Sequence, residues 1–166
     1  MSKYDPGGSQ TTYQSGSNDR VLANKLGITD PAEADDAELV LLEKLYKRVL
    51  TEQLPVGSVD TNLIKAWHRQ WLYPIYGWAG EERSVNLTRD GFQFAAAQQI
   101  PSLLKTLDRD YLALLTPCTD LNDEALIEAI AKVHVEFILV HPFREGNGRI
   151  ARLLADVMAV QAGYPT

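Results

Sequence analysis

The chain has 166 residues, a hydrophobic content of 45%, a charged content of 23% and a formal net charge of −6. This length suits one domain with its own core, and the acidic balance argues against a general nucleic-acid-binding surface. The sequence holds no apolar run that predicts a membrane span and no secretory signal core, and the single cysteine, Cys118, excludes an internal disulfide. We therefore expect a cytoplasmic protein, although specialised delivery into another cell stays open.

Residues 2–20 contain no aliphatic side chain and consist mostly of small and polar residues. This composition predicts a disordered N-terminal arm over residues 1–20, followed by one domain over residues 21–166. Residues 29–33, Thr-Asp-Pro-Ala-Glu, predict a helix start with a capping oxygen and a proline in the first turn. The helix would run to about Leu50, with an apolar stripe of Leu39, Leu42, Leu45, Tyr46 and Val49.

A second helix is predicted after a loop at residues 54–57, with Asp60 as its cap. Its buried face would carry residues that recur at helical spacing, namely Leu63, Ile64, Trp67 and Trp71. His68 lies beside these tryptophans, and we expect it to be a hydrogen-bonded structural histidine.

Between Arg83 and Phe94 the apolar period changes from that of a helix to that of a strand. Apolar and polar residues alternate on both sides of Asp90-Gly91, which predicts a short hairpin. Such a hairpin is marginally stable alone, so it must lie against the rest of the domain. Helices are predicted after it at about Ala96–Leu115, Asp123–Leu139 and Arg149–Ala162, with His134 buried in the middle one. The predicted fold class is mainly α, a helical bundle with one small hairpin.

The segment from His141 to Arg152 combines residue types that suit a phosphate site. His141 has an ordinary pKa near working pH and can accept a proton from an attacking hydroxyl. Glu145 offers the hard oxygen that magnesium binds beside phosphates. Gly146 and Gly148 let successive backbone N–H groups turn toward an anion. Arg149 and Arg152 lie three residues apart, so on a helix they share one face and can bind oxyanions.

Other interpretations of this segment explain less of it. A tight turn would account for Gly-Asn-Gly but not for the histidine, the acid and the arginines around it. Gly146–Ala151 also fits a dinucleotide fingerprint, but the chain ends at Thr166, before the required strand and acid. A zinc site formed by His134 and His141 would separate two helical ligands by about 10 Å, which is too far for one ion.

The segment resembles the Fic family motif H-x-F-x-[D/E]-G-N-G-R-x-x-R at every specified position. The matching residues are His141, Phe143, Glu145, Gly146, Asn147, Gly148, Arg149 and Arg152. Upstream, residues 76–83, Tyr-Gly-Trp-Ala-Gly-Glu-Glu-Arg, are similar to the family segment that leads into the active-site flap. Residues 24–28, Asn-Lys-Leu-Gly-Ile, resemble the N-terminal stretch of small bacterial Fic toxins.

This resemblance implies a Fic-fold helical bundle and transfer of AMP from ATP to a Ser, Thr or Tyr hydroxyl of a target protein. His141 would be the base, and Glu145 would hold Mg²⁺. The ATP phosphates would be bound by Gly146, Asn147, Gly148, Arg149 and Arg152, while Phe143 would anchor the loop in the core. The hairpin would be a flap over the active site that docks the target through Ser84, Val85, Asn86, Leu87, Thr88, Arg89, Asp90, Gly91 and Phe92.

The resemblance also bears on regulation. Many Fic proteins carry an inhibitory helix with the motif [S/T]-x-x-x-E-[G/N], and this chain has no full match. We therefore expect inhibition in trans by a small antitoxin that presents a glutamate to Arg152; the alternative is an inhibitory helix beyond Thr166. For the activity, the alternatives are a Fic-fold enzyme that transfers another phosphate-containing group, or a catalytically silent nucleotide-binding or adaptor domain.

Overall fold

Helix α1 (Pro31–Lys47) opens the bundle of this computed structural model, which describes residues 9–166. Asp30 caps it by accepting a hydrogen bond from the backbone N–H of Ala32, and a π-helical turn over Arg48–Glu52 continues it. The predicted apolar stripe is partly wrong, because Leu39 is 52% exposed. The buried positions are Ala34, Glu38, Leu45 and Val49, so the inner face carries a carboxylate at a position where an apolar residue is expected.

Helix α2 (Thr61–Leu72) begins at Asp60, whose side chain accepts a hydrogen bond from the backbone N–H of Leu63, as predicted. Its inner face buries Ile64, Trp67 and Trp71, and His68 lies fully buried among them. The prediction of a structural, hydrogen-bonded histidine is therefore confirmed. This buried aromatic face is what places α2 against the centre of the bundle.

The hairpin consists of β1 (Thr88–Arg89) and β2 (Phe92–Gln93), which pair antiparallel with Thr88 opposite Gln93. Asp90 and Gly91 form the two-residue turn and have φ angles of 50° and 81°. Positive φ at both turn positions matches the right-handed twist of the strands, which is why Asp-Gly suits this turn.

The predicted helix over Ala96–Leu115 changes pitch along its length instead of staying regular. A 3-10 turn at Ala97–Gln99 leads into α3 (Ile100–Leu107), a π-helical turn at Asp108–Leu112 and the short α4 (Ala113–Leu115). Helix α5 (Asp123–Val140) begins at Asn122, whose side chain accepts from the backbone N–H of Ala125. His134 on α5 is half-buried, so the expectation of a buried histidine there is wrong.

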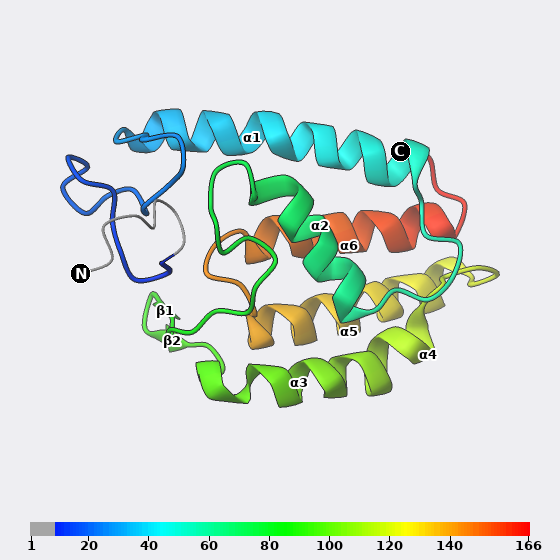
Figure 1. The fold of residues 1–166 in the computed structure, drawn as a ribbon. Helices are drawn as coiled ribbons and strands as arrows, with labels where there is room; N and C mark the ends of the chain where they lie inside the picture. Colours follow the sequence, from blue (N-terminus) through cyan, green and yellow to red (C-terminus); the bar gives the residue numbers. More distant parts are fainter. Residues whose placement is uncertain (1–8) are drawn as a thin grey trace.

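Helix α6 (Asn147–Gln161) begins two residues earlier than predicted, because Gly146 takes a left-handed conformation that ends the preceding loop. In Figure 1 the helices α1, α6, α5 and α3 lie one below another, and α2 crosses obliquely in front of α6. Helix α5 packs along α6, and α2 contacts α1, α3 and α6. The largest fully buried side chains between them include Trp71, Trp78, Phe137, Phe143, Ile64 and Leu72.

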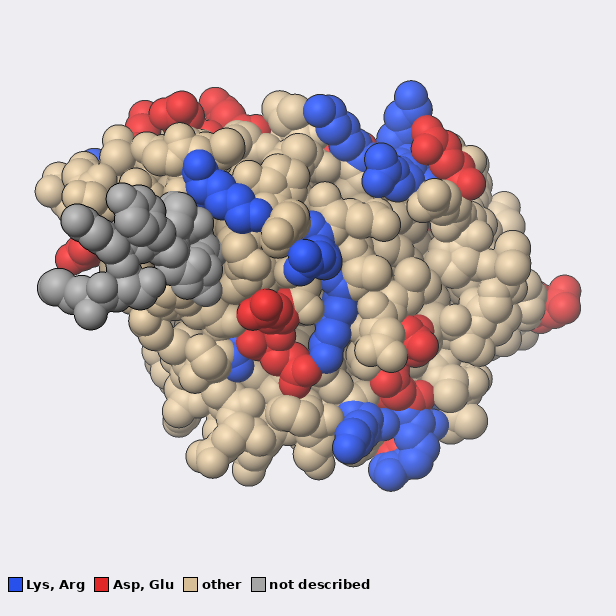
Figure 2. Space-filling model, in the orientation of Figure 1, with Lys and Arg blue, Asp and Glu red and all other residues tan. Residues whose placement is uncertain are grey.

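The structure therefore confirms the fold class, a mainly helical bundle with one small hairpin. The hairpin, the α5–α6 loop and the N-terminal segment gather at the same end of the bundle, and the C-terminus lies at the other (Figure 1). Figure 2 shows basic and acidic side chains interspersed on this face rather than gathered into one basic field. Within residues 9–166, no helix combines the length and the apolar character that a membrane span requires.

The predicted arm over residues 1–20 lies partly outside the described residues, which begin at 9. Residues 9–20 differ from the expectation of disorder, because Gln10 and Ser17 are buried and Tyr13 forms a β-bridge with Leu22. The Gln10 side chain donates to the carbonyl of Glu82 and accepts from the backbone N–H of Ser84. Polar side chains thus attach this segment through hydrogen bonds, which its lack of aliphatic residues does not predict.

Candidate functional site

His141 directly follows α5 and has a left-handed backbone with a φ of 51°. Its ring Nδ1 lies 3.2 Å from the carbonyl oxygen of Ile138. A carbonyl oxygen can only accept, so Nδ1 carries the proton and Nε2 keeps its lone pair. The ring of Phe94, at the base of the hairpin, stacks on the His141 ring at a centroid distance of 3.7 Å. The histidine is therefore held in the tautomer and orientation that a base needs.

The pKa of His141 is lowered from its ordinary value of 6.5, first because the ring is buried and further because the Arg83 guanidinium is close. The hydrogen bond to Ile138 opposes this shift in the pKa. A lowered pKa means that the neutral, proton-accepting form is present at neutral pH and is lost only as the pH falls further.

Arg83 holds the surroundings of His141 together, a role that the sequence did not predict. Its side chain is 2% exposed and donates hydrogen bonds to the carbonyl oxygens of Val85, Ala95, Val140 and His141. Two of these carbonyls are at the end of α5 and two flank the hairpin, so one guanidinium ties the flap to the helix that carries the base. It also satisfies carbonyls that the end of α5 leaves without partners. The position belongs to the segment of residues 76–83 that resembles the family, and that was its sequence signal.

The loop between α5 and α6 is closed by the side chain of Asn147. Its Oδ1 accepts from the backbone N–H of Phe143 at 2.8 Å, and its Nδ2 donates to the Phe143 carbonyl at 2.7 Å. Both polar atoms of the Asn147 side chain therefore bond within the loop, and Nδ2 keeps a second N–H, so the predicted contact with a phosphate stays a prediction. Phe143 is buried, as predicted, and its ring stacks on His68 at 3.8 Å.

His68 of α2 holds the α5–α6 loop through a hydrogen bond. Its Nδ1 accepts from the backbone N–H of Gly80, so Nε2 carries the proton and donates to the carbonyl of Glu145 at 2.9 Å. Burial lowers the pKa of His68 to about 4, so the ring stays neutral near neutral pH. A neutral ring provides the one donor and one acceptor that this arrangement uses.

Gly146 and Gly148 differ in why they lack a side chain. Gly146 has a φ of 85°, and a Cβ there would lie 2.5 Å from a ring carbon of Trp71. Gly148 has no atom within 4 Å of the place its Cβ would occupy, and its φ is not positive. Packing therefore requires glycine at 146 but not at 148, where the open space lies over the first turn of α6.

The first turn of α6 is an anion-binding site in geometry. No side chain caps this helix, and its first free N–H groups belong to Asn147, Gly148 and Arg149. Free N–H groups and the positive end of the helix dipole attract an anion. They lie in one pocket of about 620 Å³ lined by Leu87, Thr88, Arg89, Phe94, Ile138, His141, Arg144, Glu145, Gly146, Asn147, Gly148, Arg149 and Arg152.

The pocket collects the predicted base, metal ligand and phosphate-binding residues, but only part of the predicted flap. Leu87, Thr88 and Arg89 line it. The other flap residues lie elsewhere, and several anchor the hairpin: Ser84 bonds Gln10, the Val85 carbonyl accepts from Arg83, and Asn86 accepts from the N–H of Ala97. Asp90, Gly91 and Phe92 form the exposed tip. The Arg144 side chain also donates to the carbonyl of Gln10.

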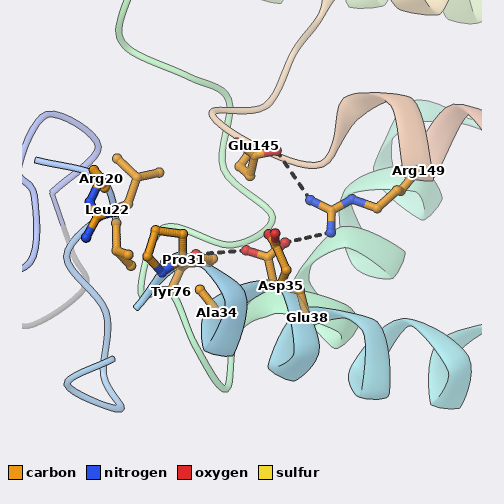
Figure 3. Close-up of a pocket in the computed structure, with 10 residues that line it drawn as sticks. Arg20, Leu22, Pro31, Ala34, Asp35, Glu38, Tyr76, Glu145 and Arg149 are labelled. Carbon is orange, nitrogen blue, oxygen red and sulfur yellow. Dashed lines mark hydrogen bonds and ion pairs between the residues drawn. The ribbon is translucent and has the colours of Figure 1, made fainter. Parts of the chain in front are cut away.

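The two arginines of the segment have different surroundings. Arg152 is exposed, and no ion pair of Arg152 is found within residues 9–166. Arg149 forms ion pairs with Glu145 and with Glu38 of α1 (Figure 3). Burial raises the pKa of Glu38, while Arg149 and the Tyr76 hydroxyl act in the opposite direction. The sequence analysis missed Glu38, and its signal was a carboxylate on the inner face of a helix.

The fold and the pocket define a helical domain in which a histidine with a free Nε2 lies beside an uncapped helix start. The chain belongs to the Fic/DOC family, whose model matches residues 58–159. It is 29% identical over 149 residues to the probable protein adenylyltransferase y4lH of Sinorhizobium fredii, covering 87% of this chain and 73% of that protein. It is 31% identical to the probable protein adenylyltransferase Fic of Salmonella typhimurium, covering 87% and 70%.

Among solved structures, the BepC protein of Bartonella tribocorum, a VirB-translocated effector with bound AMPPNP, has a TM-score of 0.80. It is 25% identical, and the match covers 93% of this chain and 79% of that one. The resemblance found in the motif is thus confirmed at the level of family and fold.

Replacing Gly146 and Gly148 by alanine, one at a time, should show that the fold requires glycine at the first position but not at the second. We expect Gly146→Ala to lower the free energy of unfolding by about 2–5 kcal/mol, since it adds both backbone strain and overlap with Trp71. Gly148→Ala should leave it unchanged or raise it by up to about 1 kcal/mol, because alanine favours the helix. Urea unfolding measures both values, and equal destabilisation would contradict the distinction.

The His141 ring should titrate below its ordinary pKa of 6.5. Because burial is the main cause, Phe94→Ala should expose the ring and raise the pKa toward 6.5. NMR titration of the His141 ring protons in both proteins measures the two pKa values. A pKa of His141 at or above 6.5 in the unchanged protein would contradict the prediction.

Proposed function

We propose that this protein is an adenylyltransferase that moves AMP from ATP to a Ser, Thr or Tyr hydroxyl of a target protein. Both curated relatives described above carry the name probable protein adenylyltransferase. The BepC structure binds AMPPNP, an analogue of ATP. These names and this ligand belong to the relatives. The geometry of the site in this chain supports the same activity here.

One observation carries the proposal: a histidine with a free Nε2 shares a pocket with an uncapped helix start whose glycine has no packing role. Packing leaves the space at Gly148 open, and a phosphate close to the backbone would use it. The orientation of His141 needs no ligand, because Ile138 and Phe94 already hold the ring. A base and a phosphate site so arranged support transfer to a hydroxyl.

In the reaction, Nε2 of His141 accepts the proton of the target hydroxyl, and the hydroxyl oxygen attacks the α-phosphorus of ATP. A new P–O bond forms to the target, the bond from the α-phosphorus to the bridging oxygen breaks, and pyrophosphate leaves. The N–H groups at the start of α6 lie where they can stabilise the negative charge that develops on the α-phosphate oxygens. Arg152 has an exposed guanidinium and would bind the outer phosphates.

Glu145 is the side chain that would hold Mg²⁺. Within residues 9–166 no group of three or more His, Cys, Asp or Glu side chains forms a metal cage. A single carboxylate beside a phosphate site fits magnesium, which takes one or two carboxylates together with substrate phosphates. The ion would neutralise negative charge on the phosphates when bound.

The flap would dock the target segment. Its strands are short and exposed, and residues Leu87–Arg89 lie along the same pocket as His141. An exposed strand edge can pair with an extended peptide through backbone hydrogen bonds. A target segment paired there would bring a hydroxyl toward the base.

Two alternatives to AMP transfer are distinguished by a test with labelled donors. A related enzyme could transfer another phosphate-containing group, and a silent domain could bind nucleotide without transfer. The silent domain is disfavoured because the base, the carboxylate, the open helix start and Arg152 are all present in one pocket. Incubation with ATP labelled on the α-phosphate, or with other labelled donors, separates the three.

Replacing His141 by alanine should lower the transfer rate by about 10²–10⁴-fold, because the base is removed. ATP binding should persist, since the helix start and the arginines are untouched. Labelled-ATP transfer and calorimetric ATP binding measure these quantities, with His134→Ala, a histidine on the preceding helix α5, as the control. Transfer by His141→Ala at the rate of the unchanged protein would rule out this base.

We further propose that inhibition acts in trans, through a small antitoxin that presents a glutamate to Arg152. Arg152 is exposed and has no ion pair within residues 9–166, which supports this proposal. The stretch Thr29–Glu33 has the threonine and glutamate of the inhibitory motif but not its last position. It contains the cap Asp30 and the first turn of α1, so it does not act as an inhibitory helix. An inhibitory helix beyond Thr166 is the alternative.

Expression of this chain without a partner should arrest bacterial growth, because no glutamate restrains Arg152. His141→Ala should relieve the arrest, and growth curves of the two strains measure the difference. Normal growth of cells that contain soluble protein able to transfer AMP in vitro would contradict the proposal of a toxin.

A further inference from the structure

A carboxylate on the inner face of α1 lies behind the active-site pocket. Glu38 is 4% exposed, and its Oε2 lies 2.6 Å from Nη1 of Arg149. The Tyr76 hydroxyl donates to its Oε1 at 2.8 Å, and the indole N–H of Trp71 donates to its backbone carbonyl. Figure 3 shows Glu38, Tyr76, Arg149 and Glu145 as one connected set of interactions. Both carboxylate oxygens of Glu38 are thus engaged by other elements of the fold.

Arg149 joins this buried carboxylate to the proposed metal ligand. While Nη1 pairs with Glu38, Nη2 lies 3.3 Å from Oε1 of Glu145, and the guanidinium lies over the Trp71 ring at 4.5 Å. Two carboxylates and an aromatic face therefore hold the guanidinium. A planar guanidinium with fixed donors transmits orientation between two partners better than a flexible ammonium does.

Electrostatics explains why Arg149 stays attached to α1. A buried carboxylate without a counter-ion costs several kilocalories per mole, so Glu38 needs a cation close by. Arg149 is the cation within ion-pair distance of it among residues 9–166. Moving Arg149 fully onto a phosphate would leave Glu38 unpaired, and this cost opposes such a movement.

The contacts of Glu145 use one oxygen. Its Oε1 accepts from the backbone N–H of Gly146 at 3.0 Å and pairs with Arg149. With Oε1 held in this way, the carboxylate has a defined orientation, and Oε2 is the oxygen left for a ligand. Groups that orient a metal-binding carboxylate in this manner govern how well it binds the ion.

We propose that Glu38 is a positioning residue for the metal-binding carboxylate: Glu38 holds Arg149, and Arg149 orients Glu145. Tyr76 in turn holds Glu38. This inference rests on the proposed function, in which Glu145 binds magnesium with ATP. It gives Arg149 a role in orienting Glu145, in place of the phosphate contact expected from the motif.

The test measures how tightly Mg²⁺ binds in the ATP complex, using His141→Ala protein so that no transfer occurs. Calorimetric titration of ATP at a series of Mg²⁺ concentrations gives this affinity. We expect Glu38→Gln to weaken it by about 10-fold, because the amide cannot form the ion pair with Arg149. Tyr76→Phe should weaken it less, since it removes only the hydroxyl. Asp35→Asn removes an exposed charge from the neighbouring hollow that Glu38, Tyr76 and Arg149 also line (Figure 3), and should leave the Mg²⁺ affinity unchanged.

A combined variant separates positioning from general damage. If Glu38 acts through Glu145, then Glu38→Gln added to Glu145→Gln should lower Mg²⁺ affinity no further than Glu145→Gln alone. Thermal unfolding shows whether each variant is folded, and Tyr76→Phe decides the question if Glu38→Gln does not fold.

An unchanged Mg²⁺ affinity in folded Glu38→Gln, or additive effects with Glu145→Gln, would overturn the proposal. So would faster AMP transfer by Glu38→Gln with His141 intact, because Glu38 would then restrain Arg149 rather than position it. Failure of the proposed function is distinguishable: unchanged protein would bind ATP with Mg²⁺ but transfer no AMP, while the effect of Glu38→Gln on binding would still be seen.

Discussion

The site depends on one constraint, the tight reversal of the chain between two helices that pack against each other. Helix α5 ends at Val140 and α6 begins at Asn147, so the intervening residues must turn the backbone within a short loop. Left-handed conformations at His141 and Gly146 achieve this at the two ends. The first of these turns directs the base into the pocket, and the second frees the N–H groups at the start of α6.

A reversed loop that is mostly buried leaves backbone polar groups without water, and other elements provide partners for them. Asn147 satisfies both the N–H and the carbonyl of Phe143, His68 donates to Glu145, and Arg83 donates to the carbonyls of Val140 and His141. Unsatisfied buried polar groups would each cost stability, so these contacts hold the loop in one conformation. The same contacts orient His141 and Glu145, and loop stability and site geometry thus have a common physical origin.

Electrostatics in the site follows from burial more than from net charge. The chain is acidic overall, yet the two arginines of the motif have distinct surroundings. Arg149 pairs with the buried carboxylate of Glu38, and Arg152 is exposed. Arg149 is held by carboxylates within the fold, whereas Arg152 faces the pocket. Two residues of the same type, three positions apart, acquire different properties because Arg149 lies within ion-pair distance of Glu38, whereas Arg152 has no ion pair within residues 9–166.

The sequence by itself determined the helices with clear caps, the Asp-Gly hairpin and the residues of the motif. These features are local, since caps, turns and a contiguous motif depend on neighbours within a few residues. Only the tertiary structure decided that Asn147 closes the loop, that Arg83 joins the flap to α5, that Gln10 attaches the N-terminal segment and that Glu38 meets Arg149. The last three of those contacts join segments far apart in the sequence, and Asn147 bonds Phe143 four residues away. A buried polar side chain is placed by its partner, which hydrophobic periodicity does not reveal.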